Sequence, residues 1–162
     1  MPLPNPLSRA RHNSAMNPQL NPSINPKVTA AINPKFNPWI NPARNSRINP
    51  NFNQHLNPVA TASLNPTRNS LLDPKVTHKF SGLRRLTPEA ELVGYVLRTK
   101  QKAVLLFFDK DLNWTSYAVD HGQGGYNVFD LEGTWRGYVL KNQARGWNEF
   151  NLEADWVGMI AA

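Results

Sequence analysis

The chain has 162 residues, a formal net charge of +7 and no cysteine, which excludes disulfides, thiolate metal sites and cysteine nucleophiles. The longest apolar run, residues 103–108, is far too short to span a bilayer, and the first residues carry no basic-then-apolar leader. We therefore expect a cytoplasmic protein, or one exported without an N-terminal signal peptide, that has no membrane partner.

The basic charge is concentrated in the first half of the chain. Residues 1–85 hold eleven Lys and Arg against the single acid Asp73, whereas residues 86–162 hold seven against ten acids. We predict a lead-in over residues 1–16, a basic array over residues 17–85 and a second domain over residues 86–162. The asymmetry favours an anionic partner for the array or docking of the array on the second domain, unless the charge serves only solubility.

The array repeats the unit Asn-Pro-x-apolar every four residues, as in residues 17–20 (Asn-Pro-Gln-Leu) and residues 33–36 (Asn-Pro-Lys-Phe). Proline drives the residue before it out of the α region, so the segment cannot be an α-helix. Asn followed by Pro is typical of the start of a type I β-turn, because Pro presets φ and the Asn side chain can bond the backbone two residues on. Each unit therefore predicts a turn followed by one apolar residue.

The units pair into octads with two columns of side chains. The first column is wholly apolar: Ile24, Ile32, Ile40, Ile48, Leu56, Leu64, Leu72 and Phe80. The second column is mixed: Leu20, Val28, Phe36, Arg44, Phe52, Ala60, Arg68, Val76 and Arg84. We predict an all-β fold that begins with an Asn-Pro β-turn solenoid, in which coils of two octads stack Ile24 over Ile40 and the mixed column lies nearer a rim. The alternative is a disordered low-complexity tract.

After residue 91 the pattern changes to short runs of aromatic and β-branched residues bounded by Gly, Asp and Asn, which indicates strands. The strands are expected at residues 92–99, 102–109, 113–120, 125–130, 133–140, 146–151 and 155–160. Short turns between consecutive strands favour an antiparallel meander. A meander edge and an uncapped solenoid end would both expose unpaired backbone, so self-association is expected.

The second domain has its own repeat of 21 residues. Trp114, Trp135 and Trp156 are in register, and residues 125–135 (GYNVFDLEGTW) match residues 146–156 (GWNEFNLEADW). Each copy predicts an aromatic hairpin with a tight turn. This pattern over residues 108–160 resembles the YD hairpin repeats of Rhs-type proteins. The resemblance implies a structural or interaction module of a bacterial repeat protein and no catalytic residue.

Basic side chains of the array are the first candidate site. They recur at multiples of four residues, so one face of the array could follow a phosphate or sulfate backbone. The expected contacts to an anionic polymer, either nucleic acid or anionic polysaccharide, are Arg44, Arg47, Arg68, Lys75, Arg84 and Arg85.

Aromatic residues of the second domain are the second candidate site. If the column Trp114, Trp135 and Trp156 faces outward, it could form a platform that stacks on sugars or bases. Aromatic residues at this spacing on strands also pack across strands in a core, so both interpretations stay open.

Two clusters of polar residues are weaker candidates for a functional site. Asp109, Asp111 and Asn113 resemble the start of a calcium loop but lack its distal Glu, so ordinary turn chemistry explains them. Asp120 and His121 precede a Gly-rich loop and could serve a toxin-type enzyme, although no nucleophile motif accompanies them. We expect no metal and no cofactor.

The sequence therefore predicts a non-enzymatic structural or interaction module that binds a protein partner or itself. Nucleic-acid or other anionic-polymer binding through the array is the main alternative, and a toxin-type enzyme in the second domain is the weaker one.

Overall fold

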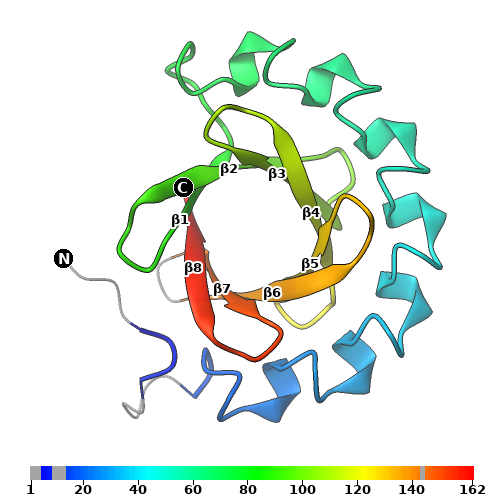
Figure 1. Ribbon diagram of the computed structural model, residues 1–162, viewed down its shortest axis with the longest axis vertical. Helices are drawn as coiled ribbons and strands as arrows, with labels where there is room; N and C mark the ends of the chain where they lie inside the picture. Colours follow the sequence, from blue (N-terminus) through cyan, green and yellow to red (C-terminus); the bar gives the residue numbers. More distant parts are fainter. Residues whose placement is uncertain (1–4, 9–13, 143–144) are drawn as a thin grey trace.

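The array winds around the outside of a closed β-barrel (Figure 1). The computed structural model describes residues 5–8, 14–142 and 145–162; residues 1–4 and 9–13 of the predicted lead-in lie outside these ranges. In Figure 1 the array forms one arc that passes along the barrel wall from the side of β8 to the side of β3. The two halves of the sequence thus share one packed interface, which is the docking that the charge asymmetry suggested.

Two kinds of turn alternate through residues 14–80. One tetrad of each octad forms a 3-10 turn. In the other tetrad the first carbonyl accepts two N–H groups, as the Asn33 carbonyl does from Phe36 at 3.0 Å and from Asn37 at 2.9 Å. The 3-10 turns are η1 (Pro22–Ile24), η2 (Ala30–Ile32), η3 (Pro38–Ile40), η4 (Ser46–Ile48), η5 (Gln54–Leu56), η6 (Ala62–Leu64) and η7 (Ser70–Leu72).

Asparagine is used in the array because its side chain both accepts and donates. The Oδ1 atom of Asn53 accepts the N–H of His55 at 3.1 Å, which closes the turn that follows. Its Nδ2 donates to the carbonyl of Arg47 at 2.9 Å, which ties η5 to η4. Where Thr61 replaces Asn, its hydroxyl donates to the carbonyl of Gln54 at 2.6 Å, so the tie between neighbouring turns is kept.

The prolines fall into two classes that differ in burial. Those at every eighth residue are never replaced, and all but the last are buried: Pro18, Pro26, Pro34, Pro42, Pro50, Pro58, Pro66 and Pro74. At the second position of the other tetrad, Pro22 and Pro38 are exposed, and other octads place Ala, Ser, Gln or His there. Proline is therefore retained where it faces the barrel and variable where it faces solvent.

Eight antiparallel strands form the barrel, and β8 closes it by pairing with β1. The seven predicted strands appear as β2 to β8, but β1 was missed because Leu-Arg-Arg-Leu was assigned to the basic array. The strands follow one another in the order of the predicted antiparallel meander, but the sheet is closed and so lacks the free edge that was expected to favour self-association. The strands are β1 (Leu83–Leu86), β2 (Leu92–Arg98), β3 (Val104–Asp109), β4 (Trp114–Asp120), β5 (Gly125–Asp130), β6 (Trp135–Lys141), β7 (Trp147–Asn151) and β8 (Trp156–Ala161).

The wholly apolar column of the array packs on the outer wall of this barrel. Ile48, Leu56 and Leu64 are buried in one cluster with outward side chains of the strands, among them Leu106 and Phe108. The prediction that the column stacks on itself in 16-residue coils is therefore wrong. The barrel supplies the apolar surface, so the array needs no coils of its own to bury its column.

Hydrogen bonds fix the array at the tips of the hairpins. The third residue of the octad's first tetrad donates to a hairpin-turn carbonyl at three places: Gln19 to Ala154 at 3.0 Å, Asn51 to Leu131 at 2.7 Å and Lys75 to Lys110 at 3.3 Å. Asn51 and Lys75 are three octads apart, while their acceptors are one 21-residue repeat apart. Three octads thus span one hairpin in this interval, whereas four octads separate Gln19 from Asn51.

Truncation of the array's inward column should destabilise the whole protein. Leu56 is 1% exposed, so Leu56→Ala should lower the free energy of unfolding by about 3 kcal/mol in denaturant titrations. Phe52, four residues earlier, is 77% exposed, so Phe52→Ala should change it by less than about 0.5 kcal/mol. Equal effects of the two changes would contradict the packing described above.

Candidate functional site

The array presents large apolar rings to solvent on the side that faces away from the barrel. Phe36, Trp39 and Phe52 are 71%, 78% and 77% exposed. They occupy the fourth position of the single turns and the third position of the 3-10 turns. Because the inward apolar column is fixed on the barrel, the same turn geometry forces these two positions outward. Exposed rings of this size are candidates for a contact surface.

Arginine alternates with these rings in the same two rows. Arg44 lies between Phe36 and Phe52 in the first row, and Arg47 follows Trp39 in the second; both arginines are exposed. We call the surface formed by Phe36, Trp39, Arg44, Arg47, Phe52 and His55 the aromatic-arginine face.

No carboxylate side chain lies in this face. Over residues 14–80 the sequence contains one acid, Asp73, and its Oδ1 accepts the N–H of Lys75 at 2.9 Å, away from the face. A surface of this kind can stack flat rings and neutralise anionic groups at the same time. Arg44 and Arg47 were predicted from the sequence as contacts, whereas the aromatic rings beside them were not. The signal was present, since a column that holds Arg44 and Arg68 must face solvent and Phe36 and Phe52 share that column.

The other predicted contacts do not join this face. Arg68 is exposed two octads beyond Phe52, and Lys75 is held by its bond to the Lys110 carbonyl. Arg84 lies beyond the array with its guanidinium carbon 5.7 Å from the centroid of the Phe80 ring.

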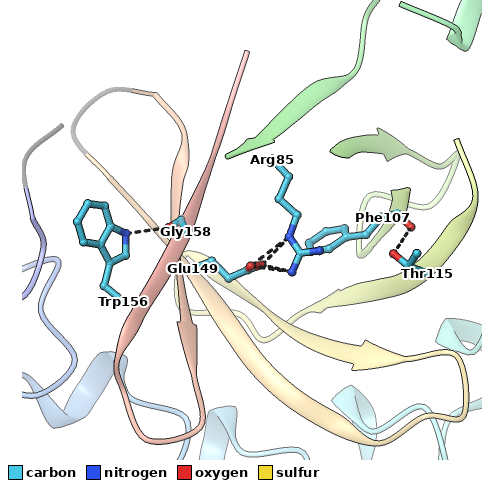
Figure 2. Close-up of polar contacts among 6 residues, drawn as sticks. All are labelled: Arg85, Phe107, Thr115, Glu149, Trp156 and Gly158. Atoms are coloured by element: carbon cyan, nitrogen blue, oxygen red, sulfur yellow. Dashed lines mark hydrogen bonds and ion pairs between the residues drawn. The ribbon is translucent and has the colours of Figure 1, made fainter. Parts of the chain in front are cut away.

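Arg85 points into the barrel rather than to the surface. Its guanidinium forms a salt bridge of 2.8 Å with Glu149, and Nε and Nη2 both donate to that carboxylate (Figure 2). The guanidinium carbon lies 5.1 Å from the centroid of the Phe107 ring. Arg85 therefore belongs to the barrel interior, and its prediction as a contact to an anionic polymer is wrong.

Glycines near this pair allow the backbones of neighbouring strands to approach closely. A side chain at Gly137 would place its first carbon 2.3 Å from the Phe150 carbonyl oxygen, and one at Gly158 would meet the Leu86 carbonyl oxygen at 2.6 Å. An eight-stranded barrel is just wide enough for side chains to fill, and here bulky and small residues alternate to do so. Arg85 and Glu149 line a small hollow of about 100 Å³, and the Arg85 side chain is 25% exposed.

The tryptophan column lies on the outer wall beside the array. Trp135 is buried and Trp114 and Trp156 are half-buried. Each indole N–H donates to the carbonyl two residues later, as Trp156 does to Gly158 at 2.7 Å (Figure 2). Lys27 of the array lies with its Nζ 6.0 Å from the centroid of the Trp135 ring. The rings thus pack beside the array and form no fully exposed platform.

Asp120 and His121 form no hydrogen-bonded pair. The Oδ1 of Asp120 accepts the N–H of Gly122 at 2.7 Å, and Nδ1 of His121 accepts the N–H of Gln123 at 3.2 Å. His121 is 3% exposed, and burial lowers its pKa to about 4 although the nearby Asp120 charge opposes this. The geometry lends no support to an Asp–His catalytic dyad at this loop.

The acidic turns use their oxygens internally. Asp109 accepts the N–H groups of Asp111 and Asn113, both at 2.9 Å, and these bonds hold the pKa of its carboxyl below the ordinary value, the Asn113 N–H most strongly. Over residues 5–8, 14–142 and 145–162, no three His, Cys, Asp or Glu side chains are grouped as metal ligands.

Comparisons with known proteins give no relative: no family model, no curated protein and no solved structure matches this chain. The resemblance of residues 108–160 to YD hairpin repeats therefore stays a prediction. Among the residues that the structure describes, no helix has the length and apolar composition needed to cross a membrane.

Loss of Glu149 should destabilise the barrel through the charge that it leaves behind. Glu149 is 7% exposed at its side chain, so Glu149→Leu leaves the Arg85 guanidinium without a counter-charge and should cost about 3 kcal/mol in unfolding free energy. The double change Arg85→Met with Glu149→Leu should return stability to within about 1 kcal/mol of the parent. A double variant as unstable as the single one would show that the pair acts through shape rather than charge.

His121 should make stability depend on pH. Its pKa is about 4 in the folded chain against an ordinary value of 6.5, so between these values only the unfolded chain takes up the proton. The free energy of unfolding should therefore fall as the pH falls from 6.5 to 4, by roughly 3 kcal/mol in total. His121→Asn keeps an acceptor for the Gln123 N–H and should remove this part of the pH dependence. Parallel pH profiles for the two proteins, measured in denaturant titrations, would refute the assignment.

Proposed function

We propose that this protein is a non-enzymatic binding module in which the barrel supports the array and the aromatic-arginine face binds single-stranded nucleic acid. The observation that carries the proposal is the exposure of Phe36, Trp39 and Phe52 beside Arg44 and Arg47. The residues lie on a stretch of chain that contains a single acid in 67 positions, residues 14–80.

The chemistry of the face favours unpaired bases. Single strands are bound by grooves or surfaces that combine cations for the backbone with aromatic rings for the bases, and each stacked base contributes about 1–3 kcal/mol. A duplex keeps its bases stacked on one another, so it would use the arginines and leave the rings unused. An anionic polysaccharide would use the same arginines, with weaker contacts to the rings. Single-stranded nucleic acid is the ligand that uses both parts of the face.

Fluorescence anisotropy with a labelled oligothymidylate and the full-length chain tests this proposal. Binding should weaken as salt rises, because phosphate contacts release counterions. Trp39→Ala and Phe52→Ala should each weaken binding about tenfold without changing the slope of log affinity against log salt. Arg44→Gln with Arg47→Gln should reduce that slope by roughly 1.4.

The matched control removes equal charge elsewhere. Lys100 and Lys110 are exposed on barrel loops, so Lys100→Gln with Lys110→Gln should leave binding by the array unchanged. Absence of binding at low salt, or equal losses for the control and the array variants, would reject the proposal. Tighter binding of duplex or of heparin than of oligothymidylate would assign the face to an anionic polymer of another class.

A further inference from the structure

A cavity of about 280 Å³ opens at one mouth of the barrel, at the end opposite the hairpin tips that contact the array. Its wall includes Arg98 at the end of β2, Lys102 in the loop that follows, Leu105 of β3 and Tyr126 of β5. The packed interior around Phe107 begins below it. Any ligand is therefore confined to the mouth.

Tyr126 lines the cavity and packs against Trp147, which lies behind it and does not line the cavity. The rings of Tyr126 and Trp147 meet edge to face, with centroids 6.1 Å apart at an angle of 75°. The Trp147 indole nitrogen is buried and has no hydrogen-bond partner within the described part of the chain. Small-molecule sites in proteins combine an apolar or aromatic surface with a few convergent polar groups, and this mouth has both.

The polar groups of the mouth are mainly cationic. Within the described residues neither Arg98 nor Lys102 is paired with a carboxylate. Arg98 donates through Nη1 to the Ser81 carbonyl at 3.1 Å, which fixes the guanidinium while its other nitrogens remain available. Asp120 is the acid close enough to act on Tyr126, and its Oδ1 is already bonded to the Gly122 N–H.

We propose that this mouth is a binding site for a small aromatic carboxylate. The carboxylate would lie between Arg98 and Lys102, and the ring would pack against Tyr126. The site is on the barrel, so it is independent of the aromatic-arginine face of the array.

Titration of the full-length chain with benzoate, followed by the indole N–H signal of Trp147 in NMR spectra, tests this site. Trp147→Phe assigns the signal. Benzoate should shift it with saturation, and benzamide, which has the same ring without the charge, should bind at least tenfold more weakly. Lys102→Met should weaken benzoate binding about tenfold. Lys100→Met removes the same charge from the same loop at a residue that does not line the cavity, and should have no effect.

Three results would overturn the proposal: no saturable shift, equal binding of benzoate and benzamide, or equal loss in the Lys102 and Lys100 variants. Phenyl phosphate provides a second anion. If it binds tighter than benzoate and shows the same dependence on Lys102, the site selects phosphate and the carboxylate assignment fails. Oligothymidylate should not displace benzoate, since the array and the mouth are separate sites.

Discussion

The structure depends on contact between one apolar column of the array and the outer wall of the barrel. Short Asn-Pro turns have no regular helix or sheet to stabilise them, and an isolated row of one apolar residue per eight cannot form a core. The barrel in turn has aromatic side chains on its outside, such as Tyr117 and Phe129, that would otherwise meet water. The barrel wall buries the apolar column of the array, and the array buries the apolar side chains on the outside of the barrel. Each part therefore depends on the other to remove its apolar surface from water.

Two repeats of different length share this interface through a few hydrogen bonds at the hairpin tips. Between Asn51 and Lys75, three octads pass over one 21-residue hairpin repeat, so the same octad position meets the equivalent hairpin-tip carbonyl, whereas four octads separate Gln19 from Asn51. Between these points the Asn ties and the buried prolines hold the turns at constant spacing. The regular inward face in turn leaves the outward positions free of structural demands. That freedom explains why Phe, Trp and Arg can occupy them.

Much of this architecture could be predicted from the sequence, and the predictions that were wrong have physical reasons. The octad column from Ile24 to Phe80 was identified because burial on one side leaves a period, and strands β2 to β8 were identified because their turns are chemically distinct. The partner of that column could not be deduced, because a period reveals that a face is buried and not what buries it. Strand β1 was missed since its two arginines, one of them inside the barrel, look like part of a basic array. Phe36 and Phe52 were predicted to lie near a rim, although Arg44 and Arg68 in the same column already indicated that this column faces solvent.

Amide hydrogen exchange on the intact protein tests the dependence of the array on the barrel most directly. The N–H groups that close the array turns, such as those of Asn53 and Leu56, should exchange only through openings that detach the array. Their protection should fall sharply in the variant Leu64→Ala, which shortens a side chain buried against the barrel. Barrel amides of β6 should also lose protection in the same variant, because the whole protein is destabilised, but they should stay more protected than the array amides. Array amides that exchange as fast as an unstructured chain in the parent protein, while the barrel stays protected, would contradict the account.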